Sequence, residues 1–376
     1  MKRDPGSEDG SLFSAVRRRG SRFSVALIAV ATLALAGALA GPHSGRAAGV
    51  VQAGHTASSV EGLAKAGKHC SATASALYRA CGFEVEDDYW VTYAKCTNES
   101  DAADREECLS DARASRREAA ANCGDEYEGR RKACRKLGEG RYDPDFDEEL
   151  FDDDFRALTN PNRYYPLTIG SRWEFRSSTE TVTVEVLDQT KSIDDVTCIV
   201  VRDLVYSDGK LKEATDDWYA MAKDGNAWYC GEEVKNFESF PGDAPSLPEL
   251  VSIDGSFKAG RDLDKPGIIF LAEPTEGATY LEEFSLGNAE DVTEILATDY
   301  SYGDDDDLDE FVPRDLAELL CDGDCVVTKN YSLLEPGVIE RKYYAPGIGV
   351  FLEVAPDAGE VLRLTACNVD PRCSGL

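Results

Sequence analysis

The spacing of apolar residues divides the chain into parts of different character. Phe23–Ala40 is an uncharged apolar run of 18 residues. Between residues 58 and 140 the chain is rich in Ala, Arg and Glu, and residues 102–121 contain no Pro or Gly, which favours helix. After Asn160-Pro161, short β-branched segments alternate with polar turn residues, which predicts strands. We therefore expect an α+β protein, in which a helical module precedes an antiparallel β domain.

The β domain, residues 159–376, is predicted to be a series of hairpins. Asp224-Gly225-Asn226 lies between two strand segments and is typical of a hairpin turn. One short helix is expected at Pro313–Leu320. Because no long helices separate the strands, we expect an antiparallel meander or half-barrel of about ten strands. The predicted strands are Trp173–Arg176, Thr181–Leu187, Cys198–Tyr206, Leu211–Ala222, Ala227–Glu232, Thr279–Ser285, Val292–Asp299, Val326–Leu333, Val338–Tyr344, Gly349–Val354 and Glu360–Ala366.

Residues 1–40 have the form of a secretory signal peptide, with basic residues before the apolar run and the small-x-small site Ala38-Leu39-Ala40 after it. We expect cleavage near Ala40 and a secreted or periplasmic protein, with residues 41–57 as a flexible linker. The alternative is a membrane anchor, because 18 residues lie at the lower limit for spanning a bilayer. In that case the uncleaved signal segment would be the only part of the protein that binds the membrane. The Arg17-Arg18 pair leaves general and twin-arginine export both open.

The first six cysteines lie in the helical module, residues 58–140, and are separated by gaps of 11, 15, 12, 15 and 11 residues. Eleven residues are about three helical turns, so the first two cysteines share one helix face, as do the last two. Cysteines about 16 Å apart on one helix cannot bond to each other. Of the fifteen possible pairings, the economical one has two antiparallel helices and the bridges Cys70–Cys134, Cys81–Cys123 and Cys96–Cys108.

Disulfides are the expected state of all twelve cysteines, because every one follows the signal segment. Zinc binding is the alternative for the first six, but zinc sites need closely spaced cysteine pairs. The last six are expected to form three more bridges, whose pairing the sequence leaves open. The twelve are Cys70, Cys81, Cys96, Cys108, Cys123, Cys134, Cys198, Cys230, Cys321, Cys325, Cys367 and Cys373.

The chain is strongly acidic, with 71 Asp and Glu against 40 Lys and Arg and a formal net charge of −31. This charge excludes nucleic acid as a partner, because phosphate backbones are bound by Lys and Arg patches. It also disfavours electrostatic binding to anionic membranes.

Residues 141–158 are predicted to be an acidic linker, with eight carboxylates between Asp143 and Asp154. The alternate spacing of three of them is similar to the start of a calcium loop, but the glycine at the sixth position and the glutamate at the twelfth are absent. A second acidic run begins at Asp304 and also lacks the glycine. No cofactor is expected, and calcium stays a weak alternative with the candidate ligands Asp143, Asp145, Asp147, Asp304 and Asp306.

The β domain contains no histidine, since His43, His55 and His69 all precede it. This excludes Ser-His-Asp and Cys-His nucleophiles there, and also His-ligated zinc or copper. Catalysis would rest on carboxylates, and the pairs Asp216-Asp217 and Glu232-Glu233 lie near aromatic residues, as in sugar-cleaving sites. Adjacent residues of a strand point to opposite faces, so neither pair forms a dyad by itself.

Aromatic residues flank the turn at 224–226 on both sides, and each predicted strand presents one of them to each face. Core packing and an aromatic wall around a ligand cavity are both open interpretations. The ligand-lining candidates are Trp173, Trp218, Tyr219, Trp228 and Tyr229.

Residues 162–356 resemble an uncharacterised group of bacterial exported proteins. Tyr164–Trp173 matches their opening signature Tyr-x-Pro-Leu-x-x-Gly-x-x-Trp, and Tyr344–Gly349 matches their closing signature Tyr-Ala-Pro-Gly-Val-Gly. Asp217–Tyr219 and Asp224–Tyr229 are also similar to that group. The resemblance implies a β fold and an envelope location, and it implies no reaction.

The chain departs from this group before the closing signature. Many members have a Val-Pro-Ala-Gly-x-Phe segment there, whereas this chain has Val312–Leu316 followed by the Cys321–Cys325 loop. The resemblance therefore gives no guidance for this stretch.

These observations favour an exported, non-enzymatic binding or envelope-associated protein. We expect the β domain to hold a small apolar or amphipathic ligand, or an envelope protein. The alternatives are a calcium-stabilised extracellular structural protein and a carboxylate-based glycan hydrolase, for which two carboxylates should converge across a cleft.

Overall fold

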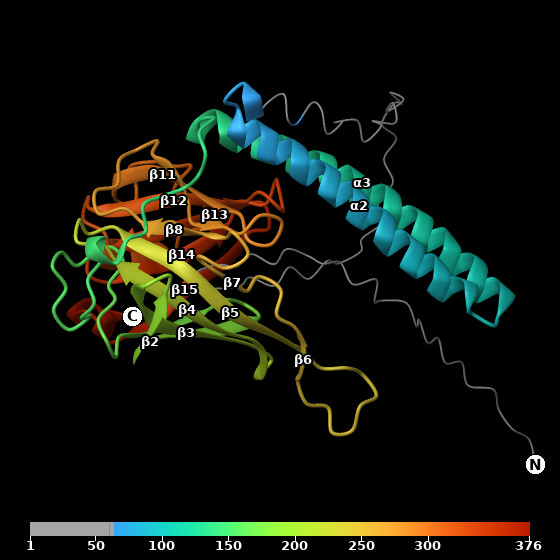
Figure 1. Cartoon of the computed structure of the whole chain (residues 1–376). Helices are drawn as coiled ribbons and strands as arrows, with labels where there is room; N and C mark the ends of the chain where they lie inside the picture. The colour runs from blue at the N-terminus through green and yellow to red at the C-terminus, as the bar shows by residue number, and fades with distance from the viewer. Residues whose placement is uncertain (1–59, 61–63) are drawn as a thin grey trace, which may run out of the picture.

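The computed structural model describes Val60 and residues 64–376. The predicted signal peptide, residues 1–40, and the predicted linker, residues 41–57, lie outside the described residues. The described chain forms a long helical hairpin and a β-barrel, joined by an extended segment (Figure 1). This is the α+β architecture that the sequence predicts.

The hairpin consists of α2 (His69–Thr97) and α3 (Ala102–Leu137). Asp101 begins α3, because its side chain accepts hydrogen bonds from two backbone amides of the first turn. The buried positions of both helices are mainly Ala and Cys, so the helices share little apolar core. Their union rests on the three bridges that the spacing predicts, namely Cys70–Cys134, Cys81–Cys123 and Cys96–Cys108.

The β domain of the described chain is one antiparallel sheet of 15 strands. Its path is β10-β8-β5-β4-β3-β2-β1-β15-β14-β13-β12-β11-β9, and β6 and β7 add to β5. The strands are β1 (Arg172–Arg176), β2 (Glu180–Ile193), β3 (Val196–Ser207), β4 (Lys210–Met221), β5 (Ala227–Glu238), β6 (Glu249–Ser252), β7 (Phe257–Lys258), β8 (Lys265–Phe270), β9 (Thr279–Leu281), β10 (Glu283–Phe284), β11 (Asp291–Tyr300), β12 (Cys325–Ser332), β13 (Glu340–Ala345), β14 (Gly349–Ala355) and β15 (Glu360–Cys367).

Each predicted strand overlaps an observed one, but β2 and β5 extend six residues beyond the predicted ends, and the predicted strand Thr279–Ser285 is divided into β9 and β10. The predicted short helix is α4 (Arg314–Leu320). The sheet has more strands than expected because β6, β7 and β8 have no strong signal in the sequence. They lie in residues 239–272, where Gly, Pro and Asp interrupt the apolar pattern.

One short segment, Thr279–Phe284, nearly closes the sheet into a barrel. Its first half, β9, pairs with β11 through three residues, and its second half, β10, pairs with β8 through two. One of those two partners is Pro266, which has no amide hydrogen to donate. We call this segment the seam. The sheet thus goes beyond a half-barrel, although very few hydrogen bonds close it.

The two signature segments of the sequence pack against each other at the apolar end of the barrel interior. The Trp173 indole donates a 2.8 Å hydrogen bond to the Ile348 carbonyl, and the Gly347 amide donates to the Arg163 carbonyl at 2.6 Å. Gly349 has φ of 89° and lies against Pro166, where a side chain would be both strained and crowded. The two motifs therefore have a shared structural role.

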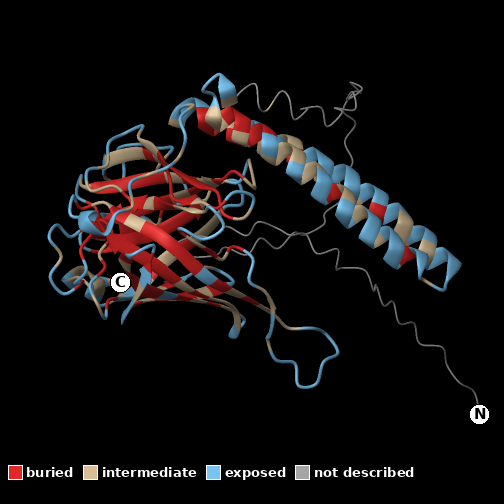
Figure 2. Cartoon of the chain, in the orientation of Figure 1, coloured by how far each residue is buried: buried red, intermediate tan, exposed pale blue. Residues whose placement is uncertain are grey.

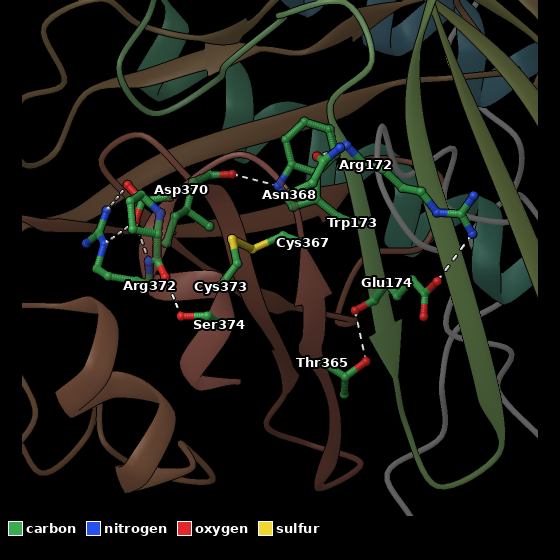
Figure 3. Close-up of a disulfide and its surroundings, with 12 residues drawn as sticks. Arg172, Trp173, Glu174, Thr365, Cys367, Asn368, Asp370, Arg372, Cys373 and Ser374 are labelled. Atoms are coloured by element: carbon green, nitrogen blue, oxygen red, sulfur yellow. Dashed lines mark hydrogen bonds and ion pairs between the residues drawn. A yellow bond between two sulfur atoms is a disulfide. The ribbon is translucent and has the colours of Figure 1, made fainter.

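The C-terminal tail fastens the same end (Figure 3). Cys367–Cys373 closes a short loop that positions η2 (Pro371–Gly375). Within it, the Arg372 guanidinium pairs with Asp370 and donates to the Pro346 carbonyl at 2.6 Å. The tail thus holds the closing signature in place from outside.

The base of the hairpin packs on the seam, and the rest of the hairpin extends away from the barrel (Figure 1). Ala133 of α3 packs with Leu281 and Val292 on the outer face of β9 and β11. The buried Arg130 guanidinium makes two 2.9 Å hydrogen bonds to the Glu290 carboxylate beside the seam. Because it covers the weakest part of the sheet, this contact holds the barrel closed.

The segment predicted as an acidic linker, residues 141–158, lies along the outer face of the barrel. Phe146 and Phe151 pack on Trp228, and Phe151 makes a β-bridge with Ala222. The Asp152 amide donates to the Met221 carbonyl at 2.9 Å. Seven of the eight acidic side chains between Asp143 and Asp154 are exposed, whereas Asp152 is buried and accepts hydrogen bonds from Thr159. Phe146 and Phe151 cover the outer face of β4 and β5.

Replacement of Arg130 by methionine tests the contact between hairpin and barrel. We expect Arg130→Met to lower the free energy of unfolding by about 3–5 kcal/mol, because it leaves the Glu290 carboxylate buried without its cation. The double variant with Glu290→Met should recover most of this loss. Arg113→Met, which breaks an exposed ion pair with Glu106, is the control and should cost at most about 1 kcal/mol. Urea unfolding measures all three, and equal losses in the single and double variants would contradict the assignment.

Candidate functional site

One half of the barrel interior carries carboxyl groups instead of apolar side chains. Eight of these lie on strands or in the seam, and none is more than 6% exposed. The members on long strands lie on the inner face by the alternation of side chains along each strand, and Glu282 and Glu283, adjacent in the seam, are both buried. We call them the carboxyl cluster: Asp203, Asp217, Glu232, Glu282, Glu283, Asp291, Glu340 and Glu353.

Sheet register brings together one member of each acidic pair singled out in the sequence. Asp217 of β4 lies directly opposite Glu232 of β5, and both face the interior. Asp216 and Glu233 form the corresponding pair on the outer face. As expected from strand geometry, the neighbours in sequence are separated by the sheet, and the pairing across strands produces the juxtaposition of carboxyls.

Glu283, in the seam, has the most unfavourable surroundings for a charge. It is 1% exposed, and neither of its carboxyl oxygens has a hydrogen-bond partner among the described residues. Burial raises its pKa well above the usual value, and the neighbouring Asp291, Glu232 and Glu282 carboxyls raise it further. Both burial and its neighbours therefore favour the neutral form of this carboxyl over the anion.

Two further members of the cluster have pKa values raised to about 8. For Asp217 the main cause is burial, opposed by the Tyr229 hydroxyl, which donates a 2.5 Å hydrogen bond to the carboxyl. For Asp291 the main cause is again burial, followed by the charge of Glu282. Burial thus raises the pKa of both carboxyls far above the usual value of an aspartate.

Lys342 is the only buried lysine among residues 64–376, and it faces the cluster from β13. Its ammonium lies 4.0 Å from the Glu353 carboxylate. Burial lowers the pKa of Lys342, but the surrounding carboxylates, led by Glu353 and Glu282, outweigh it and the net pKa is raised. One cation thus compensates eight acidic groups only in part.

Polar side chains fix some of the carboxyls in place. The Thr293 hydroxyl and the Asn330 amide both donate hydrogen bonds to Glu282. Asn330 in turn accepts from the Thr328 hydroxyl. Thr293 lies on β11, and Thr328 and Asn330 lie on the neighbouring strand β12. The hydrogen-bonded frame is therefore on these two strands, whereas Glu283 has no such support.

A small apolar cavity of about 30 Å³ adjoins the cluster, between Tyr165, Trp173, Phe175 and Val201. Val201 lies directly opposite Asp217, so the cavity and the cluster are neighbours along the barrel. The Tyr219 ring lies between the cavity and the cluster, and its centroid is 5.2 Å from the centroid of the Tyr165 ring. The cavity is far smaller than a pocket for a drug-sized ligand, so a larger guest requires the barrel to open.

The structure divides the five predicted ligand-lining aromatic residues between the two faces of the sheet. Tyr219 and Tyr229 lie inside, stacked with ring centroids 4.9 Å apart, and Trp173 lies beside the cavity. Trp218 and Trp228 belong to the cluster of side chains on the outer face, under the segment 141–158. Trp173, Tyr219 and Tyr229 therefore lie on the interior side of the sheet. Trp218 and Trp228 are separated from them by the sheet itself.

The predicted calcium ligands lie apart from the cluster. Asp143 forms an ion pair with Lys265 at 2.6 Å, and Asp147 accepts from the Glu149 amide. Asp145, Asp304 and Asp306 are exposed. In the described part of the chain, no group of three His, Cys, Asp or Glu side chains is arranged to hold a metal ion.

The sequence did not single out six of the eight cluster members. Their signal is an acidic residue at an inward position of a strand, as in the alternation Glu340, Lys342, Tyr344. Such positions are recognisable only once the inner face of each strand is known. For a glycan hydrolase the converging carboxyls should line a cleft, whereas these lie inside the barrel.

No protein-family model, no curated protein and no solved structure matches this chain. Six disulfides, three of them in the barrel domain at Cys198–Cys230, Cys321–Cys325 and Cys367–Cys373, indicate an oxidising extracellular or periplasmic environment. Among the described residues, no helix has the length and apolar character needed to cross a membrane.

The protonated cluster predicts an unusual dependence of stability on pH. A carboxyl with pKa about 8 in the folded state and about 4 when unfolded binds its proton more tightly in the folded state. The free energy of unfolding should therefore fall as pH rises from about 4 to about 8, by about 1.4 kcal/mol per pH unit for each such group.

Urea unfolding at pH 5 and pH 8 measures this dependence. Asp217→Asn should reduce the loss between the two pH values, because the amide does not titrate. Asp216→Asn, on the outer face of the same strand, should leave the loss unchanged. Stability that is equal or greater at pH 8 than at pH 5 would show that the cluster is already ionised in the folded state.

Gly267 provides a test of the seam. A Cβ atom at this position would lie 2.0 Å from the Glu282 carbonyl oxygen, so the two backbones can approach only because residue 267 is glycine. We expect Gly267→Ala to force the seam away from β8 and to destabilise the protein by about 2 kcal/mol or more. Gly124→Ala, on α3 with no atom within 4 Å of the added Cβ, should be neutral or stabilising. Hydrogen exchange of the Thr279–Phe284 amides should accelerate in Gly267→Ala alone.

Proposed function

We propose that this chain is an exported, non-enzymatic binding protein whose barrel takes a small amphipathic cation, an alkyl amine in its simplest form. The observation that carries the proposal is Glu283, a buried carboxyl whose two oxygens have no partner and whose neighbours are other carboxyls. Buried polar groups are nearly always paired, so this one marks a position for a missing donor.

A cation is the guest that the cluster favours. Eight carboxyls face one lysine, and burial keeps several of them protonated near neutral pH. A guest ammonium would replace those protons, supply up to three donors and pair with the carboxylates in a low-dielectric interior. An anionic guest would meet only repulsion, and an apolar guest would leave Glu283 unpaired.

The apolar part of the guest would lie in the neighbouring cavity. Trp173, Phe175 and Val201 line it, and Val201 is adjacent to Asp217 across the sheet. Apolar burial of each methylene is worth about 0.8 kcal/mol, so even a short alkyl chain would add affinity. The combination of carboxyls and an apolar wall specifies an amphipathic guest over a bare metal ion.

The seam is the route of entry in this proposal. Thr279–Phe284 is held to β8 and β11 by few residue pairs, and it carries Glu282 and Glu283 itself. Its displacement would expose the cluster directly. The proposal also includes export to the secreted or periplasmic side, with cleavage of the signal peptide near Ala40. The six disulfide bridges support this location.

Binding of hexylamine, 1-hexanol and heptanoate distinguishes charge from apolar character, because all three carry the same hexyl chain. We expect hexylamine, which is cationic at pH 7, to raise the melting temperature by about 5 °C at saturating concentration. Neither the alcohol nor the carboxylate should do so. Native mass spectrometry should show one hexylamine adduct per chain.

Glu283→Gln should lose this adduct, because the amide cannot pair with an ammonium. Glu233→Gln, an exposed residue on the outer face of β5, is the matched control and should keep it. An equal shift with 1-hexanol, or a full adduct on the Glu283→Gln variant, would exclude the carboxyl cluster as the site.

A further inference from the structure

The outer half of the helical hairpin, far from the barrel, carries a surface that the proposed barrel function does not use. Ala133, Arg130 and Lys136 contact the barrel at the base of the hairpin, and most of the outer half is coloured as exposed in Figure 2. The bridge Cys81–Cys123 lies near the middle of the hairpin, and Cys96–Cys108 closes its outer end. The outer hairpin is therefore a braced arm without a core of its own.

Large aromatic side chains are exposed along one face of α2 in this arm. Phe83 is 68% exposed, Trp90 58% and Tyr93 38%. The Trp90 and Tyr93 rings touch, with centroids 5.6 Å apart, and Phe83 lies two turns before Trp90 on the same side of the helix. Exposed aromatic groups of this size, gathered on one face, are typical of a contact surface for another molecule.

The charges around these rings select the kind of partner. Residues 83–118 contain eleven acidic and five basic side chains. Asp87 lies between Phe83 and Trp90 on the same face, and both Asp87 and Asp88 are exposed and form no ion pair in the described part of the chain. A second copy of this chain would place its own acidic side chains against Asp87 and Asp88, and an anionic membrane would repel both carboxylates. The charges therefore favour a basic partner.

The arm already holds one guanidinium in the manner that such a partner requires. Arg116 of α3 lies 4.6 Å from the centre of the Tyr89 ring, and its Nε and an Nη both donate to the Glu86 carboxylate, at 2.9 and 2.5 Å. A ring and a carboxylate one turn apart thus form a seat for arginine. Trp90 and Asp87 repeat this combination on the outward face, where no guanidinium from the described residues occupies it.

We propose that the face formed by Phe83, Asp87, Trp90 and Tyr93 docks an arginine-rich, partly apolar segment of another protein. The guanidinium groups would stack on Trp90 and Tyr93 and pair with Asp87, and the apolar residues between them would cover Phe83. This surface is independent of the barrel interior, so either proposal can fail while the other holds.

A peptide that alternates Leu and Arg over eight residues is a suitable probe, with the Leu and Glu alternation as its acidic counterpart. Fluorescence anisotropy with the full chain in 150 mM salt measures binding under screened conditions. We expect the basic peptide to bind and the acidic one not to bind. Trp90→Ala should weaken binding about tenfold, and Asp87→Asn about threefold.

The control variant is Phe240→Ala, which removes an exposed aromatic residue from the barrel domain and should leave binding unchanged. Melting temperature shows that each variant is folded, since the bridges that hold the arm are intact in all of them. Equal affinity of Trp90→Ala and the unmodified chain would overturn the proposal, because it would show binding through net charge alone. A dimer in sedimentation that Trp90→Ala dissociates would overturn it in favour of a second copy.

Discussion

Burial of carboxyl groups in a closed sheet is the constraint on which the rest of this structure depends. An ionised carboxylate in an apolar interior loses its hydration, and the loss is repaid only by donors or cations nearby. The barrel supplies one lysine and a few hydroxyl and amide donors, which fix Glu282 and leave Glu283 bare. Such an interior favours neutral carboxyls, and in the proposed function a cationic guest would supply the missing donors.

The same burial of carboxyl groups weakens the seam, where the barrel is closed. The strands that carry the cluster form most of the sheet, but only Thr279–Phe284 joins its two edges, and that segment carries two of the acidic residues. Repulsion within the cluster therefore acts on the part of the sheet with the fewest hydrogen bonds. The base of α3, with the Arg130 and Glu290 pair and the apolar contacts of Ala133, supplies the missing stability from outside.

The two modules are stabilised by different means. The barrel has a continuous apolar core, formed in part where the two signature segments meet. The hairpin has almost none, and three bridges substitute for it, as in other small modules that cannot bury enough apolar surface. Freed from core packing, the outer arm can present Trp90 and its neighbours to water, a use of aromatic residues that a larger helical domain would not permit.

The sequence by itself determined the local elements and the pairing within the hairpin. Strand bounds followed from alternation of apolar and polar residues, and the bridges followed from cysteine gaps of three helical turns, since both depend on backbone periods that act within one element. It also placed Asp217 and Glu232 correctly on faces opposite to their acidic neighbours. The strands β6, β7 and β8 were missed because Gly and Pro hide their pattern, and their existence depends on pairing with β5.

Only the tertiary structure decided that the sheet nearly closes and that its interior is acidic. The members of the carboxyl cluster come from β3, β4, β5, β11, β13, β14 and the seam, and they meet through registers between residues far apart in the chain. The same long-range packing placed Trp218 and Trp228 outside and Tyr219 and Tyr229 inside. Side-chain periodicity and composition are properties of a local stretch of sequence, whereas the closing of a sheet depends on pairing between distant strands. This closing buries acidic residues that would otherwise be exposed, and their pKa values rise as a result.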